Sequence, residues 1–168
     1  MSKKTVLLIF SILIIGGGIL YKNMLEINNY SSSTGESPYK GVKLETSKST
    51  YNKKDKSQKI DYKTSSFKNY SETNTTFKLS GVQSIKNGYQ ISKTPTASTG
   101  VQYQIVTKSG TVLKYVTKTG VYNGNLSVDL SNANTAGTDR KLRLANYYNL
   151  NFDNPNAPVQ SASGTFIY

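Results

Sequence analysis

From about residue 74 onward, apolar and polar side chains alternate along the chain with a period of two. Leu126, Val128 and Leu130, for example, are separated by single polar residues. This period places apolar side chains on one face of a β-strand, whereas an amphipathic helix needs a period near 3.6. Turn-forming residues recur about every ten positions. The pattern restricts this part of the chain to an all-β fold.

Two Asn-Gly pairs, Asn87-Gly88 and Asn123-Gly124, interrupt the apolar pattern. This dipeptide is typical of two-residue β-hairpin turns, so we expect a hairpin at each. Residues 71–168 are then predicted to form about seven short strands in an antiparallel, immunoglobulin-like β-sandwich. The predicted core consists of the apolar side chains that share one phase of these strands: Phe77, Leu79, Ile91, Tyr103, Ile105, Leu113, Tyr115, Leu126, Val128, Leu130, Leu142, Leu144 and Phe166.

Residues 126–146 read LSVDLSNANTAGTDRKLRLAN. This stretch resembles fibronectin type III domains, in which two alternating strands flank a Pro-Gly-Thr turn that is followed by a tyrosine. The matching positions are Val128 and Leu130 in the first strand, Gly137-Thr138 in the turn, and Leu142 and Leu144 in the second strand. Ala136 stands in place of the proline, and Arg140 in place of the tyrosine. The resemblance implies a sandwich with a binding or spacing role and identifies no site.

One long apolar run, Thr5–Tyr21, precedes this region and follows Lys3 and Lys4. As a helix, its 17 uncharged residues would be roughly 25 Å long, at the short end of the transmembrane range. The basic residues before it predict a cytoplasmic N-terminus and an exported remainder. We expect residues 1–30 to be a signal anchor that contacts the lipid bilayer. The alternative is a signal peptide cleaved after Gly18, which would release a secreted protein.

The chain contains no cysteine and no histidine. Exported eukaryotic domains of this size usually carry disulfides, so the lack of cysteine favours a bacterial envelope, and we expect a Gram-positive one. Without histidine, the commonest general base and metal ligand is missing. Of the few carboxylates, Asp129 is expected on an outer strand face and Asp139 in a turn. We therefore expect no enzyme activity, no cofactor and no metal site.

Residues 31–70 are polar and rich in lysine, and we expect a flexible tether there, interrupted by a short strand at 42–46. Between residues 40 and 68, nine lysines outnumber three acidic residues, which gives +6 of the chain's net charge of +12. Few apolar side chains are available to compensate the entropy of ordering. The lysines expected to contact a polyanion are Lys53, Lys54, Lys56, Lys59 and Lys63. The competing interpretation is a soluble spacer.

A second candidate site precedes the loop that contains Pro155 and Pro158. Tyr147, Tyr148, Asn149 and Asn151 are expected at one end of the sandwich, where binding loops gather. Exposed tyrosine rings could stack on sugars or peptides. The competing interpretation is that these rings fill the sheets, because tyrosine favours strands.

These features predict a membrane-anchored, extracytoplasmic binding or adhesion module. The expected partners are an anionic wall polymer, lipid headgroups, a host surface or another protein. Nucleic acid is not expected, because arginine is scarce and the domain is exported. The alternative is an accessory or scaffold subunit of an envelope machine such as a secretion, pilus or conjugation system. A small surface hydrolase ranks last.

Overall fold

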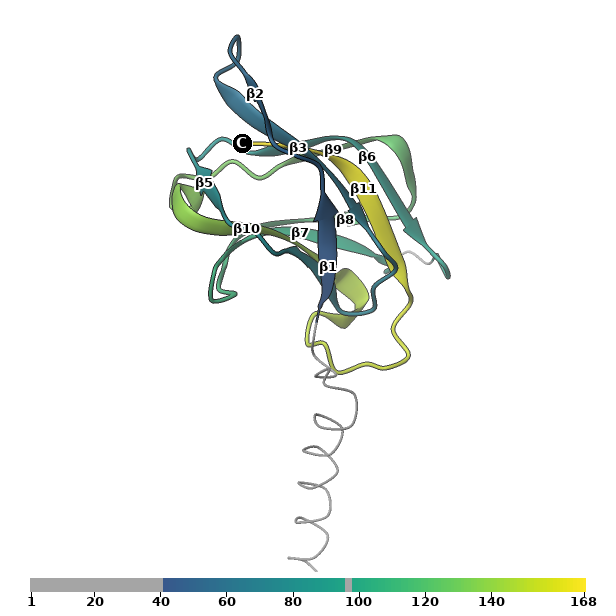
Figure 1. The fold of residues 1–168 in the computed structure, drawn as a ribbon. Coiled ribbons are helices and arrows are strands. Elements are labelled where there is room, and N and C mark those ends of the chain that lie inside the picture. Colours follow the sequence, from purple (N-terminus) through teal and green to yellow (C-terminus); the bar gives the residue numbers. More distant parts are fainter. Residues whose placement is uncertain (1–40, 96–97) are drawn as a thin grey trace, which may run out of the picture. The chain divides into compact units, whose positions relative to one another are not determined.

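The computed structural model describes residues 41–95 and 98–168, which form an all-β domain (Figure 1). The described residues contain eleven strands, and seven of them lie wholly within residues 71–168, where about seven were expected. They are β1 (Val42–Thr46), β2 (Thr50–Asn52), β3 (Ser57–Thr64), β4 (Tyr70–Thr73), β5 (Phe77–Leu79), β6 (Ser84–Ser92), β7 (Gly100–Thr107), β8 (Val112–Thr119), β9 (Tyr122–Asp129), β10 (Gly137–Asn146) and β11 (Gln160–Ile167).

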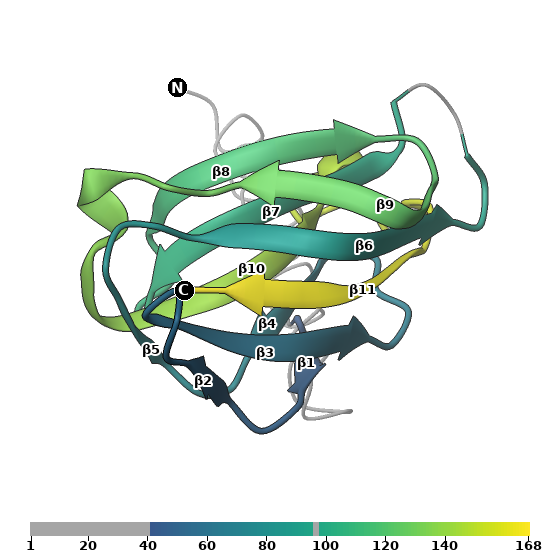
Figure 2. The same cartoon turned by 90° about the horizontal axis from the view of Figure 1, so that it is seen from above.

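All of these strands belong to one hydrogen-bonded sheet. Nine of them follow the order β8-β7-β10-β4-β1-β3-β11-β6-β9, with β2 added to β3 and β5 added to β10. The ladders are antiparallel except for the parallel pair of β1 and β4. Because the first and last strands of the order, β8 and β9, are also joined by a short turn, the sheet curls nearly into a barrel (Figure 2).

A buried side chain, and not a ladder, links β6, the neighbour of β9, to the end of β8. No ladder of the described strands joins β8 to β9. The Gln90 amide on β6 donates to the carbonyl oxygens of Lys118 (2.8 Å) and Gly120 (2.9 Å), at the end of β8 and in the turn after it. The Gln90 amide oxygen in turn accepts from the Tyr103 hydroxyl at 3.0 Å. Gln90 is fully buried, so these hydrogen bonds lie inside the domain.

Ten of the thirteen predicted core residues are buried. The other three are Leu113, Tyr115 and Ile91, and the last two are 59% and 52% exposed. The expected phase was wrong on β8, because Val116 pairs with the inward-facing Tyr103 and thereby turns Tyr115 outward. The phase was also wrong at Ile91, whose neighbour Gln90 points inward instead.

The expected tether over residues 31–70 is wrong from residue 42 onward. The strand expected at 42–46 is confirmed as β1, but β2, β3 and the start of β4 also lie in this region. On β3, Ile60, Tyr62 and Thr64 are buried, while Lys59, Asp61 and Lys63 between them are exposed. The segment therefore has a strand-like period of two, but its charged residues make its overall composition resemble that of a flexible tether.

The two Asn-Gly pairs do not form the expected hairpin turns. Asn87-Gly88 lies within β6 and Asn123-Gly124 within β9, where the pairing register shifts. Asn87 and Gly124 both have positive φ, 52° and 82°. These positions are β-bulges, which change the twist of a strand and the direction of its side chains. A turn at Ser109-Gly110, by contrast, does connect β7 and β8.

In the stretch that resembles a fibronectin type III domain, Arg140 stabilises the turn that precedes it. Its guanidinium donates to the carbonyl oxygens of Thr135 (3.2 Å), Ala136 (2.9 Å) and Thr138 (3.0 Å). These three hydrogen bonds fix the backbone of the turn against the Arg140 side chain.

The segment expected to anchor the chain, Thr5–Tyr21, lies outside the described residues, as does all of 1–30. Within residues 41–95 and 98–168, no helix has the length and apolar character needed to cross a bilayer.

Candidate functional site

The five candidate lysines lie on one hairpin and its longer strand. Lys53, Lys54 and Lys56 occupy the β2–β3 turn, which extends away from the rest of the sheet (Figure 1), and Lys59 and Lys63 lie on the outer face of β3. All five are exposed. Among the described residues the only ion pairs are those of Glu72, so none of the five is neutralised by an acidic partner. The ordered hairpin thus presents a basic surface.

A pocket of about 210 Å³ lies beside this turn. Lys56 and Lys78 contribute ammonium groups to it, and Tyr51 contributes a ring that is 59% exposed. Tyr168 forms a fixed wall, because its ring stacks on Phe166 with centroids 5.2 Å apart and its hydroxyl lies 3.1 Å from the Ser49 hydroxyl. We call this the end pocket. It combines positive charge with aromatic surface.

The second candidate site is only partly available to a ligand. Tyr147 and Tyr148 are 40% and 49% exposed, and Asn151 is also exposed. Asn149, however, is 3% exposed, and its amide donates to the Asn69 side-chain oxygen at 2.8 Å. Its own oxygen accepts from the Asn154 backbone N–H at 3.0 Å. The inclusion of Asn149 in a ligand patch was wrong, because this side chain is used to hold the loop together.

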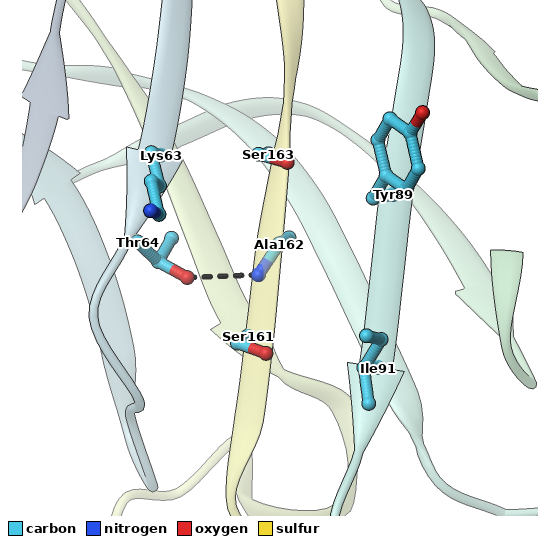
Figure 3. Close-up of a pocket in the computed structure, with 7 residues that line it drawn as sticks. All are labelled: Lys63, Thr64, Tyr89, Ile91, Ser161, Ala162 and Ser163. Carbon is cyan, nitrogen blue, oxygen red and sulfur yellow. Dashed lines mark hydrogen bonds between the residues drawn. The ribbon is translucent and has the colours of Figure 1, made fainter. Parts of the chain in front are cut away.

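The outer face of β3, β11 and β6 contains an open groove of about 250 Å³ (Figure 3). The strand register aligns Lys63, Ser163 and Tyr89 in one row across these strands. Ser161 and Ile91 form the next row. The two serines lie along the middle strand, with the lysine on one side and the tyrosine and isoleucine on the other (Figure 3).

The polar groups of the groove have no partners within the described residues. The hydroxyls of Ser161, Ser163 and Tyr89 and the ammonium group of Lys63 form no hydrogen bond there, although a Thr64 hydroxyl beside them accepts from the Ala162 backbone N–H at 2.8 Å. Tyr89 and Ile91 are 46% and 52% exposed. The groove therefore has free donors and acceptors in its floor and apolar surface on one wall.

The bulge at Gly124 positions the aromatic wall. A Cβ atom at this glycine would lie 2.9 Å from the Tyr89 hydroxyl oxygen and 3.0 Å from the ring carbon that bears it. The end of the Tyr89 ring thus lies directly over the Gly124 backbone on β9. Glycine is required for this approach and for the positive φ of 82°.

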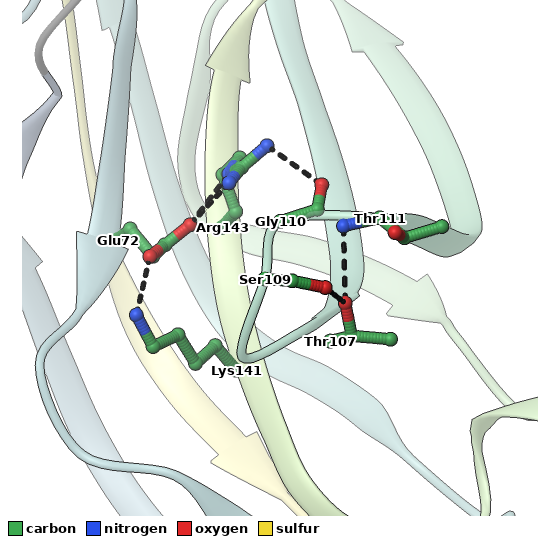
Figure 4. Close-up of polar contacts among 7 residues, drawn as sticks. All are labelled: Glu72, Thr107, Ser109, Gly110, Thr111, Lys141 and Arg143. Atoms are coloured by element: carbon green, nitrogen blue, oxygen red, sulfur yellow. Dashed lines mark hydrogen bonds and ion pairs between the residues drawn. The ribbon is translucent and has the colours of Figure 1, made fainter.

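Two carboxylates of the described residues, Glu72 and Asp129, are held by basic or backbone partners. Glu72 is 2.7 Å from the ammonium group of Lys141 and 2.6 Å from the guanidinium of Arg143 (Figure 4). The Ser131 backbone N–H donates to Asp129 at 2.9 Å and holds the pKa of that exposed carboxyl below its ordinary value. Asp129 therefore remains ionised and is unsuited to act as a general acid. No cluster of acidic side chains suited to a metal ion occurs within the described residues.

Two tyrosines inside the domain are held in their neutral form. Burial raises the pKa of Tyr62 and also raises the pKa of Tyr103 well above the ordinary tyrosine value. Both residues are almost completely buried, at 2% and 0% exposed. Their phenols belong to the polar interior of the curled sheet, and neither is available at the surface.

Comparison with protein-family models, with curated proteins and with solved structures returns no match. The site must therefore be interpreted from its own geometry.

Sequence reasoning missed both the end pocket and the groove. Tyr51 and Lys78 come together through the pairing of distant strands, and no local pattern connects them. In the groove, Ile91 was assigned to the core and Ser163 was not considered. The alternation of serines at 161 and 163 was a usable signal, since small polar residues on an outer strand face leave space between larger neighbours.

Proposed function

We propose that this protein is an extracytoplasmic binding module of a bacterial envelope, not an enzyme, and that it contacts an anionic wall polymer. In this proposal, Thr5–Tyr21 anchors the chain in the membrane and the β domain faces outward. The two walls of the curled sheet act as the layers of a sandwich that presents the basic hairpin.

The observation that carries the proposal is the set of unpaired lysines at 53, 54 and 56 on an ordered turn beside the end pocket. Exposed ammonium groups attract polyanions over about 8–10 Å at physiological ionic strength. Lys78 and Tyr51 extend the surface with a further charge and a ring. A polymer that alternates phosphate and sugar or polyol groups matches both features, because lysine binds phosphate as a point charge and aromatic rings contact apolar ring faces.

The test compares retention of full-length protein on isolated Gram-positive walls before and after chemical removal of the phosphate-containing polymer. We expect retention to fall when the polymer is removed and when Lys53, Lys54 and Lys56 are changed together to Gln. The matched control changes Lys93, Lys108 and Lys118 to Gln, which removes the same charge from other strands and turns. Equal losses from the two triple variants would show that net charge alone is responsible and would refute a hairpin site.

A protein partner is the second candidate, because β8 and β9 end the strand order without pairing to each other. Val112, Tyr115 and Val121 are 41%, 59% and 56% exposed along β8 and its turn into β9. Apolar side chains beside an unpaired strand edge favour contact with another polypeptide. A scaffold role in an envelope machine predicts copurification of a complex that Tyr115→Lys disrupts and the hairpin variant leaves intact.

A further inference from the structure

The groove between β3, β11 and β6 has features that a linear polyanion does not need. Its floor is made of the small side chains of Ser161 and Ser163, and one wall is the exposed ring of Tyr89 beside Ile91. Neighbouring strands are about 4.8 Å apart, so β3 and β6 flank a trough about 10 Å wide with β11 beneath it. These dimensions suit a ring that lies on the sheet.

The available volume limits the size of the ligand. The groove encloses about 250 Å³, which is below the range of roughly 300–1,000 Å³ found for pockets that hold drug-sized molecules. One ring with its substituents fits this space. The groove is open to solvent, so neighbouring units of a chain can continue past the ring.

The chemistry of the walls defines the ring. An aromatic ring packs against the apolar C–H face of a pyranose, and weak C–H contacts contribute to this pairing. The unpartnered serine hydroxyls match sugar hydroxyls, because both can donate and accept. On the opposite wall, the free ammonium group of Lys63 favours a negative substituent, because an ion pair adds charge attraction to the hydrogen bond. Its cross-strand neighbour Glu45 lies directly opposite in the register but forms no ion pair with it.

We propose that this groove binds a pyranose that carries one negative group, as a single unit of a longer saccharide. A uronic acid is the simplest such sugar. The inference goes beyond the proposed polymer contact of the hairpin, because it assigns a ring-shaped ligand to the groove and relies on Tyr89, Ser161 and Ser163 instead of the turn lysines.

The test measures binding of methyl β-D-glucuronide to the full-length protein by isothermal titration calorimetry. Its two comparison probes are methyl β-D-glucoside, which has the ring without the charge, and inorganic phosphate, which has the charge without the ring. We expect the glucuronide to bind at least about tenfold more tightly than either, a difference of about 1.4 kcal/mol. Equal binding of glucuronide and glucoside would overturn the role of Lys63, and equal binding of glucuronide and phosphate would overturn the ring site. Failure of the glucuronide to bind would also overturn the proposal.

Variants locate the site. Lys63→Gln should abolish the preference for the charged sugar, Tyr89→Ala should weaken both glycosides by about fivefold or more, and Ser163→Val should weaken them by filling the floor. The matched controls are Lys59→Gln on the same strand and Tyr115→Ala on β8, which remove an equally exposed lysine and tyrosine outside the groove. All positions are on the surface, so folding is preserved. If the controls weaken binding as much as the groove variants, the assignment to this groove is wrong.

Loss of wall retention in the hairpin variant, with glucuronide binding intact, would show that the two sites act independently.

Discussion

Two regions on the outer face of the same sheet differ in how their charged groups are paired. On β4 and β10, Glu72 is paired with both Lys141 and Arg143, and all three side chains are 13–17% exposed. On β3 and β6, Lys63 and Tyr89 are exposed and have no polar partner within the described residues. Charged groups that lose water need a partner, whereas exposed ones do not. The paired cluster therefore has a structural role, and the unpaired one is available to a ligand.

The paired cluster is fixed from several directions. Arg143 lies opposite Glu72 in the ladder of β10 and β4. Its guanidinium lies 4.7 Å from the centroid of the Tyr70 ring, and it also donates to the Gly110 carbonyl oxygen at 3.4 Å (Figure 4). These contacts join two strands and the β7–β8 turn, so the cluster cannot be opened without cost to the fold.

Glu72→Ala is expected to have the largest effect. It leaves two half-buried cations without a carboxylate, and we expect a loss of about 2 kcal/mol in the free energy of unfolding, measured by urea denaturation. The control is Lys63→Gln in the groove, which should change stability by less than about 0.5 kcal/mol. If the two substitutions are equally costly, the distinction between a structural and an available cluster is wrong.

Gly124→Ala should have the next largest effect. Alanine at a positive φ costs roughly 1–2 kcal/mol, and the new Cβ would also displace the end of the Tyr89 ring. Gly120→Ala is a matched control, since Gly120 has a similar φ of 88° and no atom within 4 Å of the new Cβ. Both variants should lose similar stability in urea, but only Gly124→Ala should weaken glucuronide binding. If the two variants bind glucuronide equally well, the bulge at Gly124 does not position the Tyr89 ring for the ligand.

The all-β class and most of the core could be predicted because a period of two survives in strands such as β9. The strand β3 is hard to predict because Lys59, Asp61 and Lys63 occupy one phase of its alternation, so its composition indicates a tether although its period indicates a strand. The Asn-Gly pairs were misinterpreted because the same positive φ serves a hairpin turn and a bulge. Only the pairing of β6 with β9 distinguishes the two, and that pairing is not local information.

The candidate sites were predictable to the extent that they lie on one continuous segment. The lysines of the β2–β3 hairpin are consecutive in sequence, so they were found even though the hairpin was expected to be flexible. The groove draws on three strands separated by up to about a hundred residues in the chain. Its row of Lys63, Ser163 and Tyr89 exists only once the register is known.

Tyr62→Phe is expected to have the smallest effect at neutral pH. It tests the interior side of β11 below the groove, because the Tyr62 hydroxyl lies 3.0 Å from where a Cβ on Gly164 would be. Burial raises the pKa of Tyr62 in the folded state, while the unfolded chain retains a pKa of about 10. The stability that depends on a neutral phenol is therefore complete below pH 10 and is lost as the pH rises above it. The change in the free energy of unfolding caused by Tyr62→Phe should therefore be about 0.8 kcal/mol more favourable at pH 10.5 than at pH 7. Urea denaturation at both pH values measures it. Tyr115→Phe, at an exposed tyrosine, should show no such gain in stability at pH 10.5. An equal gain there would mean that burial of the Tyr62 phenol is not the cause of the pH dependence.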